Sequence, residues 1–95
     1  MEVQEAVLEY VSPTARDVKV AAVFNGWRPD STPMIKTKDG DWRVRLMLRA
    51  GEYEYLLVVD GQWIEDPEAD QRSANPHGGF NSVLMVPLAV RTSIL

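Results

Sequence analysis

The stretch that decides the fold is GEYEYLLVVDGQW, residues 51–63. Large apolar side chains recur at every second position before Asp60, which is the period of a β-strand with one buried face. Asp60-Gly61 then interrupts the run. Asp-Gly between apolar residues is a strong hairpin signal, because a type I′ turn needs positive φ at both central positions. The stretch therefore predicts two antiparallel strands joined by a two-residue turn.

This hairpin decides which face of the sheet carries Trp63. With Asp60-Gly61 as the loop, Val58 pairs with Trp63, and directly opposed residues point to the same face. Trp63 is therefore predicted to share a face with Leu56. The opposite face has the more continuous apolar set and is the predicted core face: Tyr53, Tyr55, Leu57 and Val59. Two readings of Trp63 stay equally open, burial beneath residues 65–79 or exposure as a recognition surface.

The same alternation recurs along the rest of the chain. It predicts further strands at residues 5–11, 18–24, 41–48 and 82–86, separated by turn signals and by a long polar stretch at residues 65–79. Short strands at such spacing are typical of an all-β, two-sheet antiparallel β-sandwich. We expect a single domain over residues 1–95, with a core of about residues 5–86 and an exit segment or linker at 87–95.

Composition limits the function. The 95 residues include 45% hydrophobic and 25% charged side chains, with a net charge of −4. Nucleic acids and anionic membrane surfaces require clustered Lys and Arg, so neither is an expected partner. The chain has no cysteine, which fits a reducing compartment. No signal peptide and no membrane-length apolar run are visible, so we expect a cytoplasmic protein.

The remaining tryptophans sit in different contexts. Trp27 follows Asn25-Gly26 in a polar loop, which favours a binding role over packing. Trp42 leads the alternating face that continues with Val44 and Leu46, so we expect it to be in the core.

Catalysis is not expected from these residues. The single histidine, His77, lies in a predicted loop without a visible partner set, where a solvated side chain is the more typical interpretation. Glu65 and Asp66 are adjacent, so a strand would point them to opposite faces. The sequence has no Cys/His metal spacing and no phosphate-binding loop. We therefore predict no metal, no cofactor and no enzymatic activity for this domain.

Several short motifs occur together in one order: FNGW (24–27), GEYEY (51–55), VDGQW (59–63), DP (66–67) and GGFNSV (78–83). As a set they resemble the family 48 carbohydrate-binding modules, over about residues 5–86. That family includes the glycogen-binding domain of the AMP-activated protein kinase β subunit and the N-terminal modules of glycogen-branching and debranching enzymes. The resemblance implies an immunoglobulin-like β-sandwich that binds α-1,4-linked glucans, such as glycogen, starch, maltooligosaccharides and cyclodextrin.

The resemblance also implies a set of binding residues. Trp27 and Trp63 match the two sugar-stacking tryptophans of the kinase subunit, and Asn81 matches its asparagine. The lysine of the kinase module falls on Leu56, and its loop leucine falls near His77. Because two of the five positions depart, a second hypothesis is a structural or protein-interaction module that has lost sugar binding. A third is one domain of a glucan-active enzyme that carries its catalytic residues elsewhere.

Overall fold

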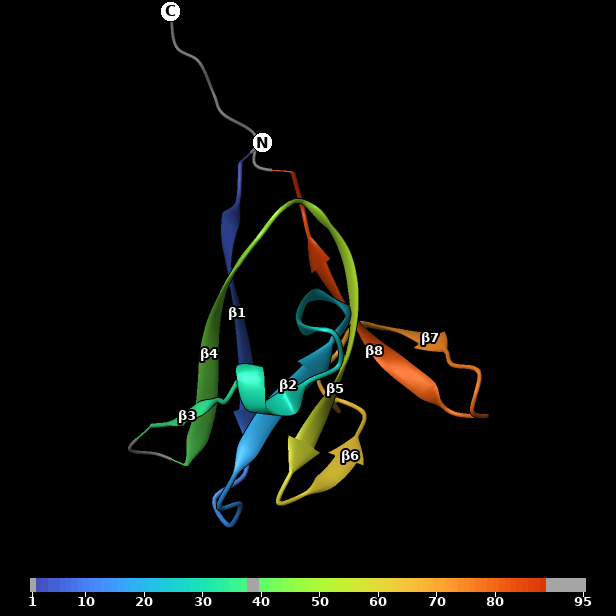
Figure 1. Ribbon diagram of the computed structural model, residues 1–95. Helices are drawn as coiled ribbons and strands as arrows, with labels where there is room; N and C mark the ends of the chain where they lie inside the picture. The colour runs from blue at the N-terminus through green and yellow to red at the C-terminus, as the bar shows by residue number, and fades with distance from the viewer. Residues whose placement is uncertain (1, 38–39, 89–95) are drawn as a thin grey trace, which may run out of the picture.

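Two antiparallel sheets form the molecule (Figure 1). The computed structural model describes residues 2–37 and 40–88. The three-stranded sheet has the order β1-β4-β3, and the five-stranded sheet has the order β2-β5-β8-β7 with β6 added beside β5. The elements are β1 (Gln4–Val11), β2 (Val18–Ala22), η1 (Val23–Asn25), η2 (Pro29–Ser31), β3 (Ile35–Lys36), β4 (Asp41–Leu48), β5 (Gly51–Val59), β6 (Gln62–Ile64), β7 (Gln71–Ala74) and β8 (Phe80–Val86). The predicted immunoglobulin-like, all-β sandwich is confirmed.

The core lies between the two sheets. Tyr55 and Leu57 of β5 are buried there with Val20 of β2 and with Leu8 and Trp42 from the three-stranded sheet. The Trp42 side chain is 5% exposed, and its indole N–H donates a hydrogen bond to the Ser12 carbonyl oxygen at 3.2 Å. The predicted burial of Trp42 is confirmed, and so is the predicted core face of β5 for Tyr55, Leu57 and Val59, whereas Tyr53 is only partly buried and lies outside the core cluster.

The β5–β6 hairpin has the predicted register. Val58 pairs with Trp63 and Val59 with Gln62. The two turn residues have positive φ, 49° at Asp60 and 85° at Gly61. Both residue types tolerate this left-handed region, which makes the tight turn possible.

The strand predicted at residues 18–24 is too long, because β2 ends at Ala22 and η1 begins at Val23. The side chain of Asn25 explains the difference. Its Oδ1 accepts a hydrogen bond from the Ala22 N–H at 3.0 Å, so the side chain competes for a backbone group that strand pairing would use. Phe24 still packs against the core, with its ring edge-to-face on Tyr53 at a centroid distance of 6.0 Å.

Two strands were not predicted. β7 lies inside the polar stretch 65–79, and β3 is only two residues long. The β7 sequence, QRSA, has no apolar alternation, and the strand forms because it pairs with β8, placing Ser73 opposite Asn81. Residues 89–95 of the predicted exit segment lie outside the described residues. In the described part of the chain, no helix is long and apolar enough to cross a membrane.

A buried polar contact holds the segment that follows β6. The Tyr55 hydroxyl donates to Asp66 Oδ2 at 2.5 Å, and the Asp66 N–H donates to Ser82 Oγ at 2.8 Å. Burial of the hydroxyl, and then its hydrogen bond to Asp66, raise the pKa of Tyr55 well above its ordinary value. Because Tyr55 points to the core face of the sheet, this contact draws the chain after β6 toward that face. The opposite face, which carries Trp63, is left uncovered by this segment.

Candidate functional site

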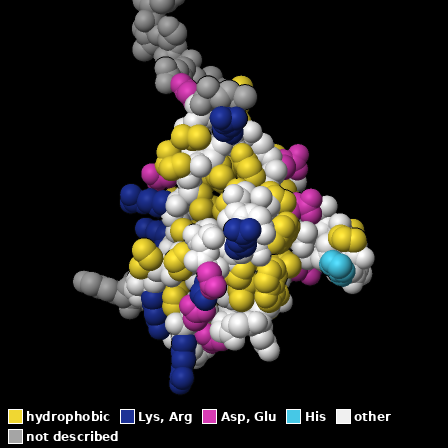
Figure 2. All heavy atoms as spheres, in the orientation of Figure 1, with side chains coloured by type: hydrophobic (Ala, Val, Ile, Leu, Met, Phe, Trp, Pro, Cys, Tyr) yellow, Lys and Arg dark blue, Asp and Glu magenta, His cyan; other side chains and the backbone are white. Residues whose placement is uncertain are grey.

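The outer face of the five-stranded sheet contains a hollow of about 390 Å³. The five residues that the family resemblance singles out all line it: Trp27, Leu56, Trp63, His77 and Asn81. Asn75 and Pro76, which sequence reasoning missed, complete the lining. Figure 2 shows hydrophobic side chains gathered on this side of the molecule, over β5 and β6. Residues from four separate parts of the chain therefore meet at one surface.

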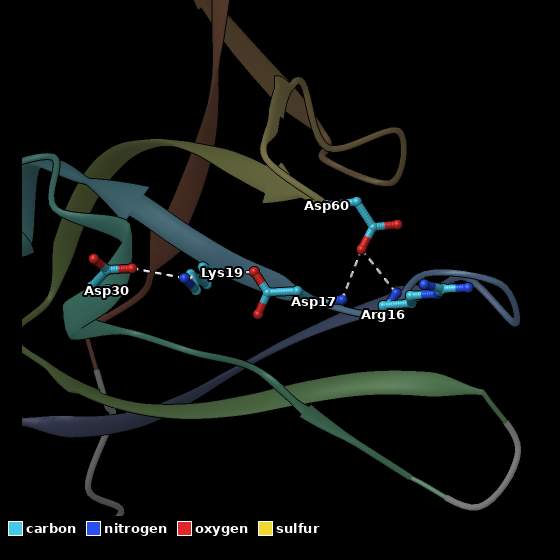
Figure 3. A network of polar contacts seen from close by, with 5 residues as sticks. All are labelled: Arg16, Asp17, Lys19, Asp30 and Asp60. Atoms are coloured by element: carbon cyan, nitrogen blue, oxygen red, sulfur yellow. Dashed lines mark hydrogen bonds and ion pairs between the residues drawn. The ribbon is translucent and has the colours of Figure 1, made fainter.

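Trp63 is presented by a short, anchored hairpin. Its side chain is 50% exposed. The sequence left burial and exposure of Trp63 equally open, and in the structure it is exposed. The turn before it is tied to the β1–β2 connection, because Asp60 Oδ1 accepts the backbone N–H groups of Arg16 at 2.9 Å and Asp17 at 2.8 Å (Figure 3). The Asp60 N–H donates in return to the Asp17 carbonyl at 2.8 Å. The indole is therefore carried on a short strand whose preceding turn is fastened at Asp60.

Trp27 follows η1 and has a strained backbone. Its φ is 60°, in the left-handed region that is unusual for a bulky residue. The conformation is held by the Trp27 N–H, which donates to the Ala22 carbonyl at 2.8 Å. The Asn25 side chain also fastens this loop, accepting from the Arg28 N–H at 3.1 Å and donating to the Thr32 hydroxyl at 2.9 Å. A strained tryptophan in a well-fastened loop supports a functional role for its ring.

The two tryptophan-bearing segments share one anchor. Lys19 Nζ lies 2.7 Å from Asp30 Oδ1 in η2 and 3.5 Å from Asp17 Oδ2 (Figure 3). The hydrogen bond to Asp30 is the main reason why the pKa of Lys19 is raised. Asp17 also bonds the Asp60 turn through its backbone. The segment from Asp17 to Lys19 therefore connects the turn before Trp63 with the loop after Trp27.

Leu56 lines the hollow from strand β5. It lies on β5, beside Ala21 of β2 and on the same face as Val58 and Trp63. Trp27 approaches from the β2 side of β5, whereas Trp63 and Asn81 belong to strands on its other side. The position that the family resemblance matches to a lysine thus contributes an apolar side chain to the lining of the hollow.

Asn81 and the β7–β8 turn form the polar side of the hollow. Asn81 is 9% exposed, and its Nδ2 donates to Glu54 Oε1 at 3.1 Å. The Asn75 side chain organises the turn, because its Oδ1 accepts the N–H groups of His77 at 2.9 Å and Gly79 at 3.1 Å. Asn followed by Pro and two glycines is a turn signal that could have identified Asn75 from the sequence.

The lining of the hollow is largely apolar, and among the described residues it contains no Asp, Glu, Lys or Arg. It consists of two indoles, a leucine, a proline and two amides, with His77 as its only titratable side chain. Within residues 2–37 and 40–88, no group of three or more His, Cys, Asp or Glu side chains could hold a metal ion. Apolar walls with a few placed amides suit an uncharged ligand that has flat apolar faces and a polar edge.

The chain resembles several known proteins. It is 33% identical over 73 residues to Protein PTST homolog 2 of Arabidopsis thaliana, covering 77% of this chain and 13% of that protein. It is 38% identical over 56 residues to the β-2 subunit of the human 5′-AMP-activated protein kinase, covering 59% of this chain and 20% of that subunit. A solved maltogenic amylase from S. marinus superposes with a TM-score of 0.73 at 18% identity, over 90% of this chain and 14% of the amylase, which supports the fold.

The expectation of a cytoplasmic location is wrong on these comparisons. Four of the plant relatives, the Arabidopsis protein included, are named as chloroplastic or amyloplastic. The absence of cysteine cannot tell one reducing compartment from another, so composition could not have made this distinction.

The family assignment rests on nearly the whole domain. Residues 5–90 match the family described as the glycogen recognition site of AMP-activated protein kinase, which is a non-catalytic carbohydrate-binding module. The match includes both strands of the hairpin that carries Trp63 and all the residues around the hollow. With its sandwich fold and its exposed tryptophan-lined surface, the chain belongs to this family of glycogen- and starch-binding modules.

Proposed function

We propose that the hollow on the five-stranded sheet binds α-1,4-linked glucan chains, with Trp27 and Trp63 stacking on the sugar rings. The observation that carries this proposal is the placement of the two indoles on either side of Leu56, around one hollow. The axial C–H groups of glucose give each ring an apolar face that matches an indole, and its hydroxyl groups suit amide partners at the rim. Glycogen, starch, maltooligosaccharides and cyclodextrin share this surface.

The departures from the kinase subunit affect affinity more than the mode of binding. Leu56 adds apolar floor where lysine would donate a hydrogen bond, and His77 provides a wall in place of leucine. With fewer polar contacts, more of the binding free energy comes from stacking area. Chains long enough to cover both indoles are therefore expected to bind more tightly than maltose or maltotriose.

A titration followed by tryptophan fluorescence tests the proposal. We expect β-cyclodextrin and maltoheptaose to change the emission in a saturable way, and maltose to do so only at much higher concentration. Cellohexaose is the matched control, because its β-1,4 linkages give a straight chain that does not follow a concave surface. Failure of β-cyclodextrin, maltoheptaose and glycogen to bind at millimolar concentration would show that the proposed function is wrong.

The chain spans 13% of the Arabidopsis relative and 20% of the human kinase subunit, so these relatives contain much more than this module. We expect any catalytic activity connected with the module to belong to other domains. A contact with another domain or protein is a second candidate function. One surface away from the glucan hollow supports it.

That surface is a groove of about 390 Å³ between β1 and β8, which we name the β1–β8 groove. Among the described strands, β1 pairs only with β4, and β7 pairs with β8 only as far as Val83. Unpaired backbone groups therefore border the groove on both sides, and strand edges of this kind accept extended segments. Among the described residues, its lining combines exposed Val7 and Met85 with the acids Glu68 and Asp70 and contains no basic side chain. The occupant that fits is an extended segment with alternating apolar and basic residues.

A synthetic nine-residue peptide of alternating valine and lysine serves as the probe. We expect it to protect β1 backbone amides from hydrogen exchange, and we expect a valine–glutamate peptide of the same length not to do so. Replacing Glu68 and Asp70 together with lysine should reverse this preference. Equal behaviour of the two peptides, or no protection by either, would exclude this partner class.

A further inference from the structure

The polar side of the hollow contains two amide side chains whose orientations are fixed by their neighbours. Asn81 lies 3.1 Å from a carboxylate oxygen of Glu54. An ionised carboxylate can only accept hydrogen bonds, so the atom of Asn81 that faces it must be the amide nitrogen. The carbonyl oxygen of Asn81 then faces the other way, toward Asn75. The usual ambiguity between the two ends of an amide is removed here by chemistry.

The same argument fixes Asn75. Its Oδ1 accepts two backbone N–H groups, from His77 and Gly79, and a backbone N–H can only donate. The amide nitrogen of Asn75 is therefore directed away from the turn, to within 3.4 Å of Asn81 Oδ1. This separation is at the long end for a hydrogen bond, so the contact is weak. The nitrogen has a second proton and the oxygen a second lone pair, and both remain available to a ligand.

We propose that Asn75 and Asn81 together bind one hydroxyl group of the glucan. Glu54 is then the positioning residue that fixes which end of the Asn81 amide faces Asn75. The hydroxyl oxygen accepts a hydrogen bond from Asn75 Nδ2 while its proton is donated to Asn81 Oδ1. Both residues line the hollow, whereas Glu54 holds Asn81 from the neighbouring strand β5. This inference rests on the proposed glucan-binding function and assigns a part of it to Asn75 and Glu54.

The arrangement selects for a particular chemical group. A hydroxyl both donates and accepts at a single oxygen atom, so it satisfies the two amides at once. A methyl ether places a methyl group, and a carboxylate places a lone pair, where the hydroxyl proton would face the carbonyl oxygen of Asn81, which then keeps only its long contact to Asn75 Nδ2. A steric clash or a lone-pair repulsion at that oxygen is unfavourable, so such ligands should be disfavoured. In this arrangement the tryptophans stack on the apolar faces of the sugar rings, and the two amides bind a free hydroxyl group.

Asn75→Asp is the variant that isolates this role. It keeps an Oδ1 atom for the N–H groups of His77 and Gly79, so the turn can form, but it removes the donor directed at Asn81. We expect the dissociation constant for β-cyclodextrin to rise about two- to tenfold, as for loss of one net hydrogen bond. The thermal unfolding midpoint should change little. Gln71→Glu is the matched control, because it makes the same amide-to-acid change on exposed β7 outside the hollow.

Glu54→Gln tests the positioning role. A glutamine can accept from Asn81 or donate to it, so Asn81 is no longer held in one orientation. We expect a smaller loss of β-cyclodextrin affinity than in Asn75→Asp, with the same order of preference among ligands. If Glu54→Gln binds as tightly as the unaltered chain, Glu54 does not position Asn81 for binding.

The ligand supplies the decisive comparison. β-Cyclodextrin methylated at all its hydroxyl groups still presents sugar ring faces but has no hydroxyl to donate. In this ligand a methyl group stands where the hydroxyl proton would face Asn81 Oδ1, so its oxygen cannot lie between the two amides. The unaltered chain should therefore bind it more weakly than β-cyclodextrin, and Asn75→Asp should cause no further loss. An equal loss with both ligands would mean that Asn75 acts only by shaping the turn, which overturns the inference.

The outcomes separate this inference from the proposed function. If the unaltered chain binds neither β-cyclodextrin nor maltoheptaose, the glucan-binding proposal itself fails. If the unaltered chain binds and Asn75→Asp binds equally well, glucan binding stands and the hydroxyl-reading pair is excluded.

Discussion

Trp42 and Trp63 are the same side chain in two settings on one sandwich. Trp42 points between the sheets, is 5% exposed and donates its indole N–H to Ser12. Trp63 points away from the core, is 50% exposed and lies beside Leu56 in an open hollow. Both sit on regular strands, so strand formation does not distinguish them. What differs is whether another layer covers the face on which each lies, and this separates a residue needed for stability from one available to a ligand.

The largest expected effect is on the buried side of this comparison. Trp42→Ala removes a large side chain from a packed interior, and we expect a loss of about 3–5 kcal/mol in the free energy of unfolding. Urea denaturation measures the change. Because a small domain has little stability to lose, Trp42→Phe serves as a companion variant in case Trp42→Ala does not fold. We expect Trp42→Phe to lose less free energy of unfolding and to keep its glucan affinity. A loss below roughly 1 kcal/mol for Trp42→Ala, a usual value for an average substitution, would contradict its role in the core.

The contact between Tyr55 and Asp66 should make stability depend on pH. The pKa of Tyr55 is raised in the folded chain, so the folded state holds this proton more tightly than the unfolded state does. The contribution is fully present below the unfolded pKa of about 10 and is lost as pH rises above it, with a slope of up to about 1.4 kcal/mol per pH unit. Denaturant unfolding at pH 8, 10 and 11 tests this.

Tyr55→Phe is the control for that slope. It leaves the buried Asp66 without its hydroxyl donor, so we expect a loss of roughly 1–3 kcal/mol at neutral pH. Above pH 10 the variant should lose less stability per pH unit than the unaltered chain. Parallel pH profiles for the two proteins would show that Tyr55 is not the group responsible.

On the exposed side, Trp63→Ala should affect binding rather than folding. Loss of one stacked ring is expected to weaken β-cyclodextrin binding by tenfold or more, taking roughly 1–3 kcal/mol per stacked aromatic as the nearest analogue. The free energy of unfolding should stay within about 0.5 kcal/mol, as is usual for surface positions. Calorimetric titration and urea denaturation of the same sample measure the two effects. A large loss of stability in Trp63→Ala would show that Trp63, like Trp42, is needed for folding, and would contradict its assignment as an exposed binding residue.

Trp27 offers a sharper test because its backbone is strained. Glycine accepts positive φ without steric cost, so Trp27→Gly should unfold no more easily than the unaltered chain. Binding of β-cyclodextrin should still fall by tenfold or more, since the ring is lost. Loss of stability together with affinity would indicate that the indole packs against the domain rather than serving the ligand.

The smallest expected effect is a gain in glucan affinity. Leu56→Lys places a donor at the position where the kinase subunit carries one, and a satisfied hydrogen bond adds roughly 0.5–1.5 kcal/mol net. We expect maltoheptaose to bind about two- to tenfold more tightly. Leu56→Met, which keeps the apolar floor, is the matched control. An unchanged or weaker affinity for Leu56→Lys would indicate that the sugar does not cross the middle of the hollow.

The sequence by itself determined the elements whose signals are local. The period of two over residues 51–59 and the Asp60-Gly61 turn predicted the hairpin and its register, and hence the face that carries Trp63. The alternation that begins at Trp42 predicted its burial. The shared motifs indicated five residues that the structure brings around one hollow, and their role in sugar binding remains a prediction. Each of these inferences depends only on residues a few positions apart, or on a set of motifs shared with a known family.

Only the tertiary structure decided whether the face of Trp63 is covered. That depends on the path of the chain after β6, which is set by Asp66 through contacts with Tyr55 and Ser82, 11 and 16 residues away. β7 has no periodic signal and forms by pairing with β8. Asn75 and Glu54 meet at Asn81 across gaps of 6 and 27 residues. Hydrogen bonds over such separations leave no period in a sequence, because they depend on how the strands are brought together in space.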